Sequence, residues 1–169
     1  MWLNARGIDA TDATWKQQFA KLPTMERRLY ERFVGQLLNT SLDECHGSCS
    51  LRDSVIANEV ATALDHFHGD RVMTGDFVVM PNHVHALLTP MDGFELEDIL
   101  HSIKSFTANK INRLFARTGP FWQRETYDHI VRDIEQLQAY QAYIAANPSK
   151  ARLTAREYIL SQAKYHVLL

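Results

Sequence analysis

Residues 78–88 are the segment that most restricts how this chain can fold. The run is apolar and β-branched, which is typical of a strand, and it carries two histidines, His83 and His85, two positions apart. Because side chains alternate between the two faces of a strand, we expect both imidazoles on one face and Val84 on the other. Such a pair can supply half of a metal site, although packing or hydrogen bonding more often explains two histidines at this spacing.

The elements around this strand predict an α+β fold. Residues 71–80 and 82–89 are expected to form two strands joined by a turn at Pro81-Asn82, and so an antiparallel hairpin. A third, short strand is expected over residues 127–132. Hydrophobic periodicity predicts helices over residues 14–38, 54–67, 94–115 and 133–147.

Proline and capping residues suggest where these helices begin and end. Pro23 is expected to divide the first helix into two. Asp133 is a suitable cap for the helix that follows the third strand, and Pro148 is expected to end that helix near Asn147. The residues around Tyr158 are expected to pack as a final helix.

The length of 169 residues predicts a single domain, with an N-terminal helical segment over 1–40 and a motif-bearing core over 41–155. No apolar run reaches membrane-spanning length, and the first residues lack the apolar region of a signal peptide. We therefore expect a cytoplasmic protein with no membrane partner. Cys45 and Cys49 are expected to be reduced thiols, because two further zinc ligands of suitable spacing are missing.

Basic residues are concentrated directly after the histidine strand. Residues 101–132 contain six Lys and Arg but two Asp and Glu, whereas the whole chain has a net charge of −2. This local excess favours a polyanionic partner. The alternative is a helix face that is simply solvated.

Tyr143 and Asn147 lie four residues apart near the end of the predicted helix 133–147, so they share one face. A tyrosine hydroxyl is a poor nucleophile at neutral pH because its ordinary pKa is about 10. It becomes useful where the electrophile is activated, for example by a metal on a phosphate oxygen. Two imidazoles and one amide oxygen would make a three-ligand site with open positions. Tyr140 is a rival nucleophile, and an Asn before Pro can be only a cap.

Taken together, these motifs resemble the HUH single-strand endonucleases, and more closely the REP-associated tyrosine transposases, relatives of the single-tyrosine transposases of small insertion sequences. The run Met80-Pro81-Asn82-His83-Val84-His85, followed by a lysine-bearing helix, Phe-Trp-Gln-Arg and Tyr-Ile-x-x-Asn-Pro, is a specific combination. The likeness rests on residues 46–53, 79–85, 102–108, 119–125, 127–128, 143–144 and 147–148.

The resemblance implies a ferredoxin-like antiparallel sheet with helices on one face. It implies that His83, His85 and Asn147 hold Mg²⁺ or Mn²⁺. It also implies that Tyr143 attacks single-stranded DNA beside a REP-like hairpin, leaving a 5′-phosphotyrosine that a later 3′-hydroxyl can reverse. A nucleoid-associated monomer with the site in one chain is what the closer subfamily implies.

DNA contacts are expected on both sides of the chain's Gly119-Pro120 turn. Cationic side chains can follow phosphates and aromatic rings can stack on unpaired bases, although core packing explains the two aromatics equally well. The candidates for these contacts are Lys104, Lys110, Arg113, Phe121, Trp122 and Arg124.

The N-terminus departs from the family pattern. Such proteins usually open with a strand of the Tyr-Phe-Val-Thr-Phe-Arg type in the middle of the sheet, whereas this chain begins Met1-Trp2-Leu3-Asn4 and enters helix-like sequence. Either the true start lies upstream or the copy is truncated. The sequence therefore leaves three hypotheses: a metal-dependent enzyme that cleaves and rejoins DNA, a truncated and catalytically impaired protein that binds DNA hairpins, and a product that scarcely folds.

Overall fold

The structure is a computed structural model that describes residues 2–27, 29–30, 48–124 and 126–163. The chain divides into two compact units, residues 1–44 and 45–169. Each unit is described by itself.

The first unit is helical where it is described. It contains a 3₁₀ helix, η1 (Asn4–Arg6), and the helix α1 (Trp15–Ala20), which ends before Pro23 as the sequence predicts. The Tyr30 ring contacts the rings of Trp2 and Phe19, at centroid distances of 5.1 and 4.9 Å. These aromatic contacts join the two ends of the segment. Residues 31–38 of the expected helix lie outside the described residues.

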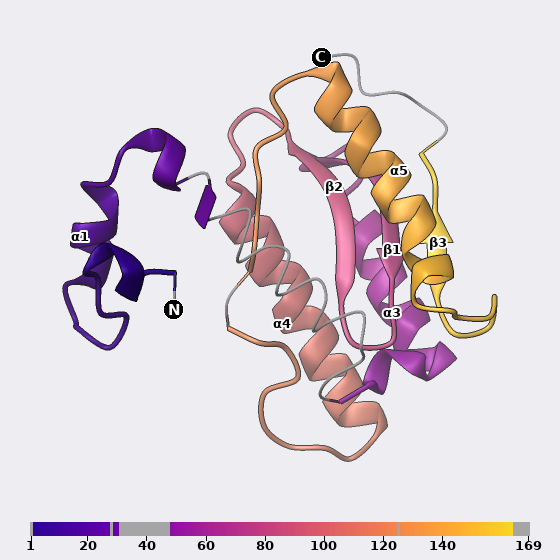
Figure 1. Cartoon of the computed structure of the whole chain (residues 1–169). Coiled ribbons are helices and arrows are strands. Elements are labelled where there is room, and N and C mark those ends of the chain that lie inside the picture. The colour runs from indigo at the N-terminus through magenta and orange to yellow at the C-terminus, as the bar shows by residue number, and fades with distance from the viewer. Residues whose placement is uncertain (1, 28, 31–47, 125, 164–169) are drawn as a thin grey trace. The chain divides into compact units, whose positions relative to one another are not determined.

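The second unit confirms the α+β class, with an antiparallel sheet and helices packed on it (Figure 1). None of the described helices combines the length and the apolar character needed to cross a membrane. The elements in chain order are η2 (Ser50–Arg52), α3 (Ser54–Asp65), β1 (Val72–Val79), β2 (Val84–Pro90), α4 (Leu96–Leu114), α5 (Ile134–Lys150) and β3 (Ile159–Ser161).

The sheet has the order β2-β1-β3, and both neighbours of β1 are antiparallel to it. The predicted hairpin of β1 and β2 is confirmed, and Val78 pairs with His85. The turn is closed by the Met80 N–H, which donates to the His83 carbonyl oxygen at 2.8 Å. The Leu51 N–H in η2 donates to the Pro81 carbonyl oxygen at 2.9 Å, so the turn is also attached to the preceding segment.

A β-bulge interrupts the ladder of β1 and β2 between Thr74 and Phe77. A Cβ atom on Gly75 would lie 3.1 Å from the Leu87 Cβ, so the close approach of the strands favours glycine here. The buried Asp76 side chain in the bulge accepts a hydrogen bond from the Ala163 N–H at 2.8 Å. The bulge thus ties the segment after β3 to the central strand.

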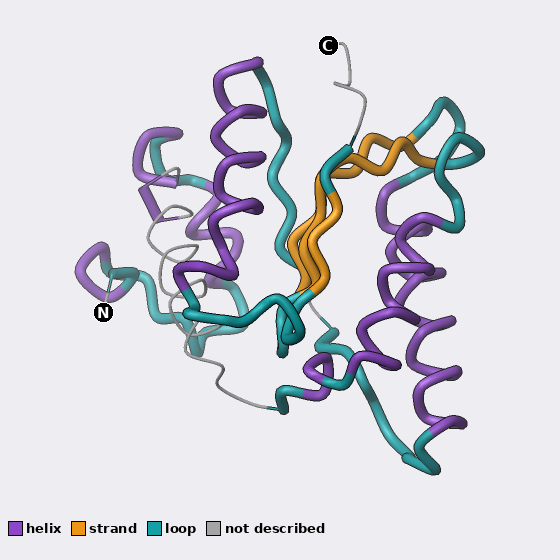
Figure 2. Tube along the Cα trace, turned by 90° about the vertical axis from the view of Figure 1, so that its right-hand side faces the viewer, coloured by secondary structure: helices purple, strands orange, loops and turns teal. Residues whose placement is uncertain are grey.

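Helices cover both faces of the sheet (Figure 2). Phe77 and Val79 of β1 pack with the buried side chains of α3 and α4, whereas Val78 packs with Met80 and with Ile144 of α5. The expectation of helices on one face is therefore wrong. The reason is that β1 is apolar at successive positions, so both of its faces need cover.

The expected strand over residues 127–132 is absent from the structure, where this described segment is irregular. Tyr127 and Ile130 are 62% and 75% exposed. Tyr127 and Ile130 are three residues apart, so they would not share one face of a strand, and the segment makes no ladder. It serves as an extended connection from α4 to α5.

Two expectations for the C-terminal part are also corrected. α5 continues through Pro148 to Lys150: the proline removes only its own N–H from the helix, and the Ala151 N–H still donates to the Asn147 carbonyl oxygen at 3.0 Å. The residues after Tyr158 form β3 rather than a helix, because β1 offers them a free edge: Ile159 pairs with Val79. Residues 164–169 lie outside the described part.

The segment before α3 is short and well anchored. Asp53 caps α3 by accepting a hydrogen bond from the Val55 N–H at 2.8 Å. Cys49 is disulfide-bonded, so the expectation of reduced thiols is wrong for this residue. Cys45, the other residue of that expectation, lies outside the described residues.

Replacing Val60 by Ala tests the core between α3 and the sheet. Val60 is 1% exposed, whereas Val55 on the same helix is 52% exposed. We expect Val60→Ala to lower the free energy of unfolding by about 2 kcal/mol through lost burial. Val55→Ala should change it by less than about 0.5 kcal/mol. Urea unfolding checks both, and equal effects would contradict the assignment of Val60 to the core.

Candidate active site

The two histidines meet at the α5 face of the sheet. His85 lies on β2 and His83 directly precedes that strand. Their Nε2 atoms are 3.1 Å apart, and the ring centroids are 4.7 Å apart at an interplanar angle of 77°. Val84 packs with the α3 and α4 core on the other face. Strand alternation predicts this arrangement.

The neighbouring amide determines where the proton of His83 sits. The Nδ1 atom of His83 is 2.7 Å from the side-chain oxygen of Asn82. Because that oxygen can only accept, the imidazole donates from Nδ1. The Nε2 atom of the neutral ring then keeps its lone pair, directed toward His85. Asn82 therefore holds His83 in the tautomer that a metal ligand needs.

Burial keeps both imidazoles uncharged at neutral pH. His83 is 7% exposed. Desolvation lowers its pKa to about 3, and the nearby His85 adds to that effect. Desolvation also lowers the pKa of His85 to about 4. A neutral imidazole is the form that coordinates metals.

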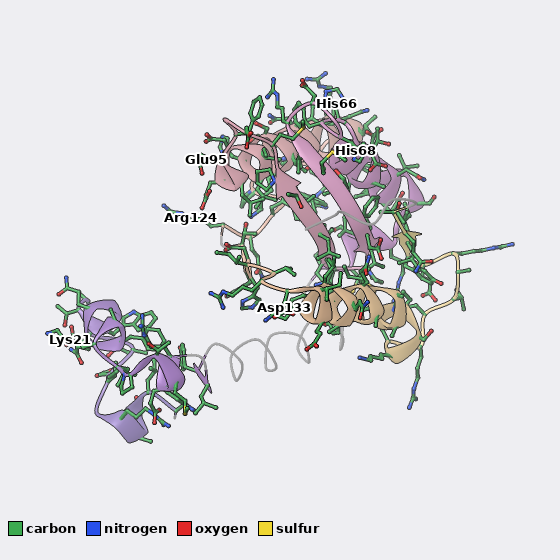
Figure 3. The ribbon with its side chains drawn as sticks, turned by 90° about the horizontal axis from the view of Figure 1, so that it is seen from above. Lys21, His66, His68, Glu95, Arg124 and Asp133 are labelled. Atoms are coloured by element: carbon green, nitrogen blue, oxygen red, sulfur yellow. The ribbon has the colours of Figure 1, made fainter. Side chains whose placement is uncertain are left out.

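Helix α5 presents Tyr143 to the histidine pair. Asp133 caps the start of α5 (Figure 3) and accepts a hydrogen bond from the Gln136 N–H at 2.7 Å. Ile144 packs against Val78 and Met80 and so fixes the helix on the sheet. The Tyr143 hydroxyl lies 3.5 Å from Nε2 of His85, and the two rings pack edge to face at 5.1 Å.

The rival tyrosine lacks this geometry. Tyr140 is half-buried on α5, three residues before Tyr143. No hydrogen bond or ring contact joins it to either histidine within the described residues. Of the two phenols, only Tyr143 is brought to His85.

Asn147 is one turn beyond Tyr143 on α5 and is completely buried. Neither its side-chain oxygen nor its side-chain nitrogen has a hydrogen-bond partner in the described structure. A buried unpaired amide costs about 1–3 kcal/mol, so its presence needs an explanation. An amide oxygen that binds a ligand or cation is one such explanation.

The described residues contain no group of three or more His, Cys, Asp and Glu side chains that could hold a metal. A metal ion at this site would therefore need a ligand of another kind in addition to the two imidazoles. The amide oxygen of Asn147 is a ligand of that kind.

Two of the residues expected to bind DNA make intramolecular contacts. The Lys104 ammonium donates to the Thr126 hydroxyl at 3.0 Å and to the Arg124 carbonyl oxygen at 3.4 Å. Lys110 forms an ion pair with Glu59 at 2.6 Å. These two lysines hold neighbouring elements together in the chain without DNA.

The aromatic candidates lie on a segment attached to α4. The Trp122 indole N–H donates to the buried Thr107 hydroxyl at 2.8 Å, and the rings of Phe121 and Trp122 pack edge to face at 5.0 Å. Both rings are half-buried and adjoin the core. They line an open pocket of about 850 Å³ formed by residues 120–124. Arg124 projects from this segment (Figure 3), and Arg113 is exposed on α4.

Sequence reasoning missed two residues at this site. The sequence places Asn82 only in the turn, although its side chain sets the His83 tautomer. The sequence motifs do not include Lys150, yet its ammonium lies 5.1 Å from the Tyr143 ring centroid. The spacing Tyr143, Asn147, Lys150 is that of one helix face, and this signal could have identified Lys150.

The depressed histidine pKa values predict a pH-dependent stability. The unfolded chain, with ordinary pKa values of about 6.5, takes up protons before the folded chain does. Stability should therefore be insensitive to these groups above about pH 6.5 and should fall as the pH drops toward 4. Urea unfolding of the metal-free protein between pH 4 and 7 measures this slope.

His85→Gln, which cannot take up a proton, should flatten that dependence. His66 is exposed at the end of α3, so His66→Gln is the matched control and should leave the slope as it is. Equal slopes for wild type and His85→Gln would contradict the buried neutral state of His85.

Comparison with known proteins supplies the family. The model of the family described as Transposase IS200 like matches residues 25–147, well over half of the chain. No curated protein and no solved structure matches the chain. The match includes the histidine pair, Tyr143 and Asn147. The chain belongs to the family of IS200-like transposases.

Proposed function

We propose that this protein cleaves and rejoins single-stranded DNA by transesterification, with Tyr143 as the nucleophile. The family implies transposase-like DNA cleavage and rejoining in general. The role of Tyr143 rests on one observation, which is that its hydroxyl and the two imidazoles lie close together. The Tyr143 hydroxyl lies 3.5 Å from Nε2 of His85, which in turn lies 3.1 Å from Nε2 of His83.

The proposed step exchanges one phosphodiester for another. A bond forms between the Tyr143 hydroxyl oxygen and phosphorus, and the bond from phosphorus to the 3′-oxygen of the upstream strand breaks. The phenol loses one proton to solvent and the departing 3′-oxygen gains one, so charge balances. The downstream strand stays attached as a 5′-phosphotyrosine, and attack by a 3′-hydroxyl reverses the step without an external energy source.

The donor set suits a divalent cation, Mg²⁺ or Mn²⁺. Neighbouring ligands of an octahedral ion with bonds of about 2.1 Å are about 3 Å apart, close to the 3.1 Å between the two Nε2 atoms. The unpartnered Asn147 amide is the third candidate ligand. When bound, such an ion supplies a positive charge that polarises a phosphate oxygen. The protein's part is to hold both imidazoles neutral and Asn82 bonded to Nδ1 of His83.

The DNA partner is proposed to be single-stranded beside a REP-like hairpin. Arg113 and Arg124 are exposed and can follow phosphates, and the pocket at Phe121 and Trp122 can receive an unpaired base. Lys104 and Lys110 already have partners within the chain and are the weaker candidates for this contact. Tyr143 meets His85 of the same chain, which supports a site in cis and a monomer.

Replacing the nucleophile tests the proposal directly. With a 3′-labelled single-stranded hairpin oligonucleotide and Mn²⁺, wild type should form a labelled covalent adduct, seen on a denaturing gel. Tyr143→Phe should lose the adduct completely, because it lacks the attacking oxygen. Tyr140→Phe, the matched control on the same helix, should retain most of it.

Other outcomes separate the competing hypotheses. An adduct that persists in Tyr143→Phe and disappears in Tyr140→Phe would transfer the role to Tyr140. Salt-sensitive DNA binding without any adduct in wild type would favour the alternative, a hairpin-binding protein without catalysis.

Metal binding can be measured without activity. Mn²⁺ should raise the melting temperature of wild type, because a ligand that binds only the folded state stabilises that state. At a Mn²⁺ concentration one hundred times the dissociation constant, the free energy of unfolding should rise by about 2.7 kcal/mol. His85→Ala should abolish the increase. His66→Ala, which removes an exposed histidine on α3, should leave it intact. An equal increase in His85→Ala would place the ion elsewhere.

A further inference from the structure

Lys150 is the last residue of α5 and lies on the same helix face as the proposed nucleophile. It is seven residues after Tyr143, which returns it to nearly the same angular position two turns later. Side chains on a helix lean toward its N-terminus, and the Lys150 ammonium lies 5.1 Å from the centroid of the Tyr143 ring. Because Lys150 is exposed, its ammonium remains accessible from solvent.

A cation at a helix C-terminus has an ordinary explanation, because it interacts favourably with the helix dipole. That explanation requires only that the charge be somewhere in the last turn. It does not require the ammonium to turn back toward the ring of Tyr143. The helix dipole therefore does not explain the cation–π contact between Lys150 and Tyr143.

Lys150 also differs from Lys110 and Arg52, which are both paired with carboxylates. Lys110 is paired with Glu59, and Arg52 with Glu157. In the part of the chain that the structure describes, Lys150 pairs with no carboxylate and contacts the Tyr143 ring. An ammonium held by an aromatic face keeps its N–H donors available for an anion.

The titratable side chains of the strands that α5 packs on can be compared with the Lys150 ammonium. α5 packs on β1 and β2, whose titratable side chains are Asp76 and His85. Asp76 accepts a hydrogen bond from the Ala163 N–H. His85 lies 3.5 Å from the Tyr143 hydroxyl through its Nε2 atom. A cation that lies against the Tyr143 ring itself is the Lys150 ammonium.

We propose that Lys150 forms a phosphate subsite beside Tyr143, where its ammonium binds a nonbridging oxygen of the DNA backbone and brings the scissile phosphodiester to the tyrosine. This inference rests on the proposed function of Tyr143. It adds a binding role that is independent of the metal ligands. The ring of Tyr143 holds Lys150 in place, and Lys150 in turn limits the orientations of that ring.

The experiment uses the full chain and measures binding and chemistry separately. In a Tyr143→Phe background, which keeps the ring but forms no adduct, binding of the hairpin oligonucleotide is measured by fluorescence anisotropy over a range of salt concentrations. Adduct formation is measured under single-turnover conditions at saturating DNA with the Tyr143 enzyme. The variants are Lys150→Gln, Lys150→Arg and the control Arg156→Gln, which removes an exposed charge after α5.

We expect Lys150→Gln to reduce the slope of log affinity against log salt by about 0.7, the value for one lost contact to a single strand. Its adduct should form about tenfold more slowly at saturating DNA. Lys150→Arg should retain most of the wild-type slope and rate, since Arg also binds phosphate. Arg156→Gln should leave the single-turnover rate unchanged.

An unchanged slope and rate in Lys150→Gln would overturn the inference, as would Lys150→Arg behaving like Lys150→Gln. If wild type forms no adduct but Lys150→Gln still reduces the salt slope, the catalytic proposal fails and the phosphate subsite stands. If wild type forms the adduct and Lys150→Gln alters neither quantity, the subsite fails and the catalytic proposal stands.

Discussion

The pairing of Val78 with His85 is the contact on which the site depends. A slip of one residue in this ladder would turn both imidazoles to the opposite face, because strand side chains alternate. The turn bond between Met80 and His83 limits such a slip at one end of the hairpin. Within the ladder, the bulge that contains Gly75 also limits such a slip. The register of β1 against β2 therefore also decides on which face of the sheet the two imidazoles lie.

A small apolar contact holds helix α5 against the hairpin of β1 and β2 and so positions its side chains beside the histidines. Ile144 packs on Val78 and Met80, and the helical period then directs Tyr143 toward His85. The same burial removes water from the imidazoles and lowers their pKa values. It also leaves the Asn147 amide without a hydrogen-bond partner among the residues that the structure describes. The site thus holds polar groups in a state that costs stability, which is common where binding or catalysis takes place.

The basic block of the sequence has more than one role in the folded chain. Lys104 and the Trp122 indole fasten the segment around residues 119–126 to α4, and Lys110 joins α4 to α3. Arg113 and Arg124 remain exposed. A charge count over a stretch of sequence cannot separate these roles, because an ammonium that bridges two helices and one that faces solvent have the same sequence signature.

Local periodicity was sufficient to predict the hairpin, the common face of His83 and His85, the Asp133 cap and the shared face of Tyr143 and Asn147. These features depend on residues a few positions apart, whose geometry follows from strand or helix repeats. The same reasoning failed for residues 127–132 and for β3, because a strand forms only where another strand offers a free edge. Only the tertiary structure brought Tyr143 to His85, paired Lys110 with Glu59 and buried Asn147. Those contacts join residues distant in sequence, and they are decided by how the helices pack on the two faces of the sheet.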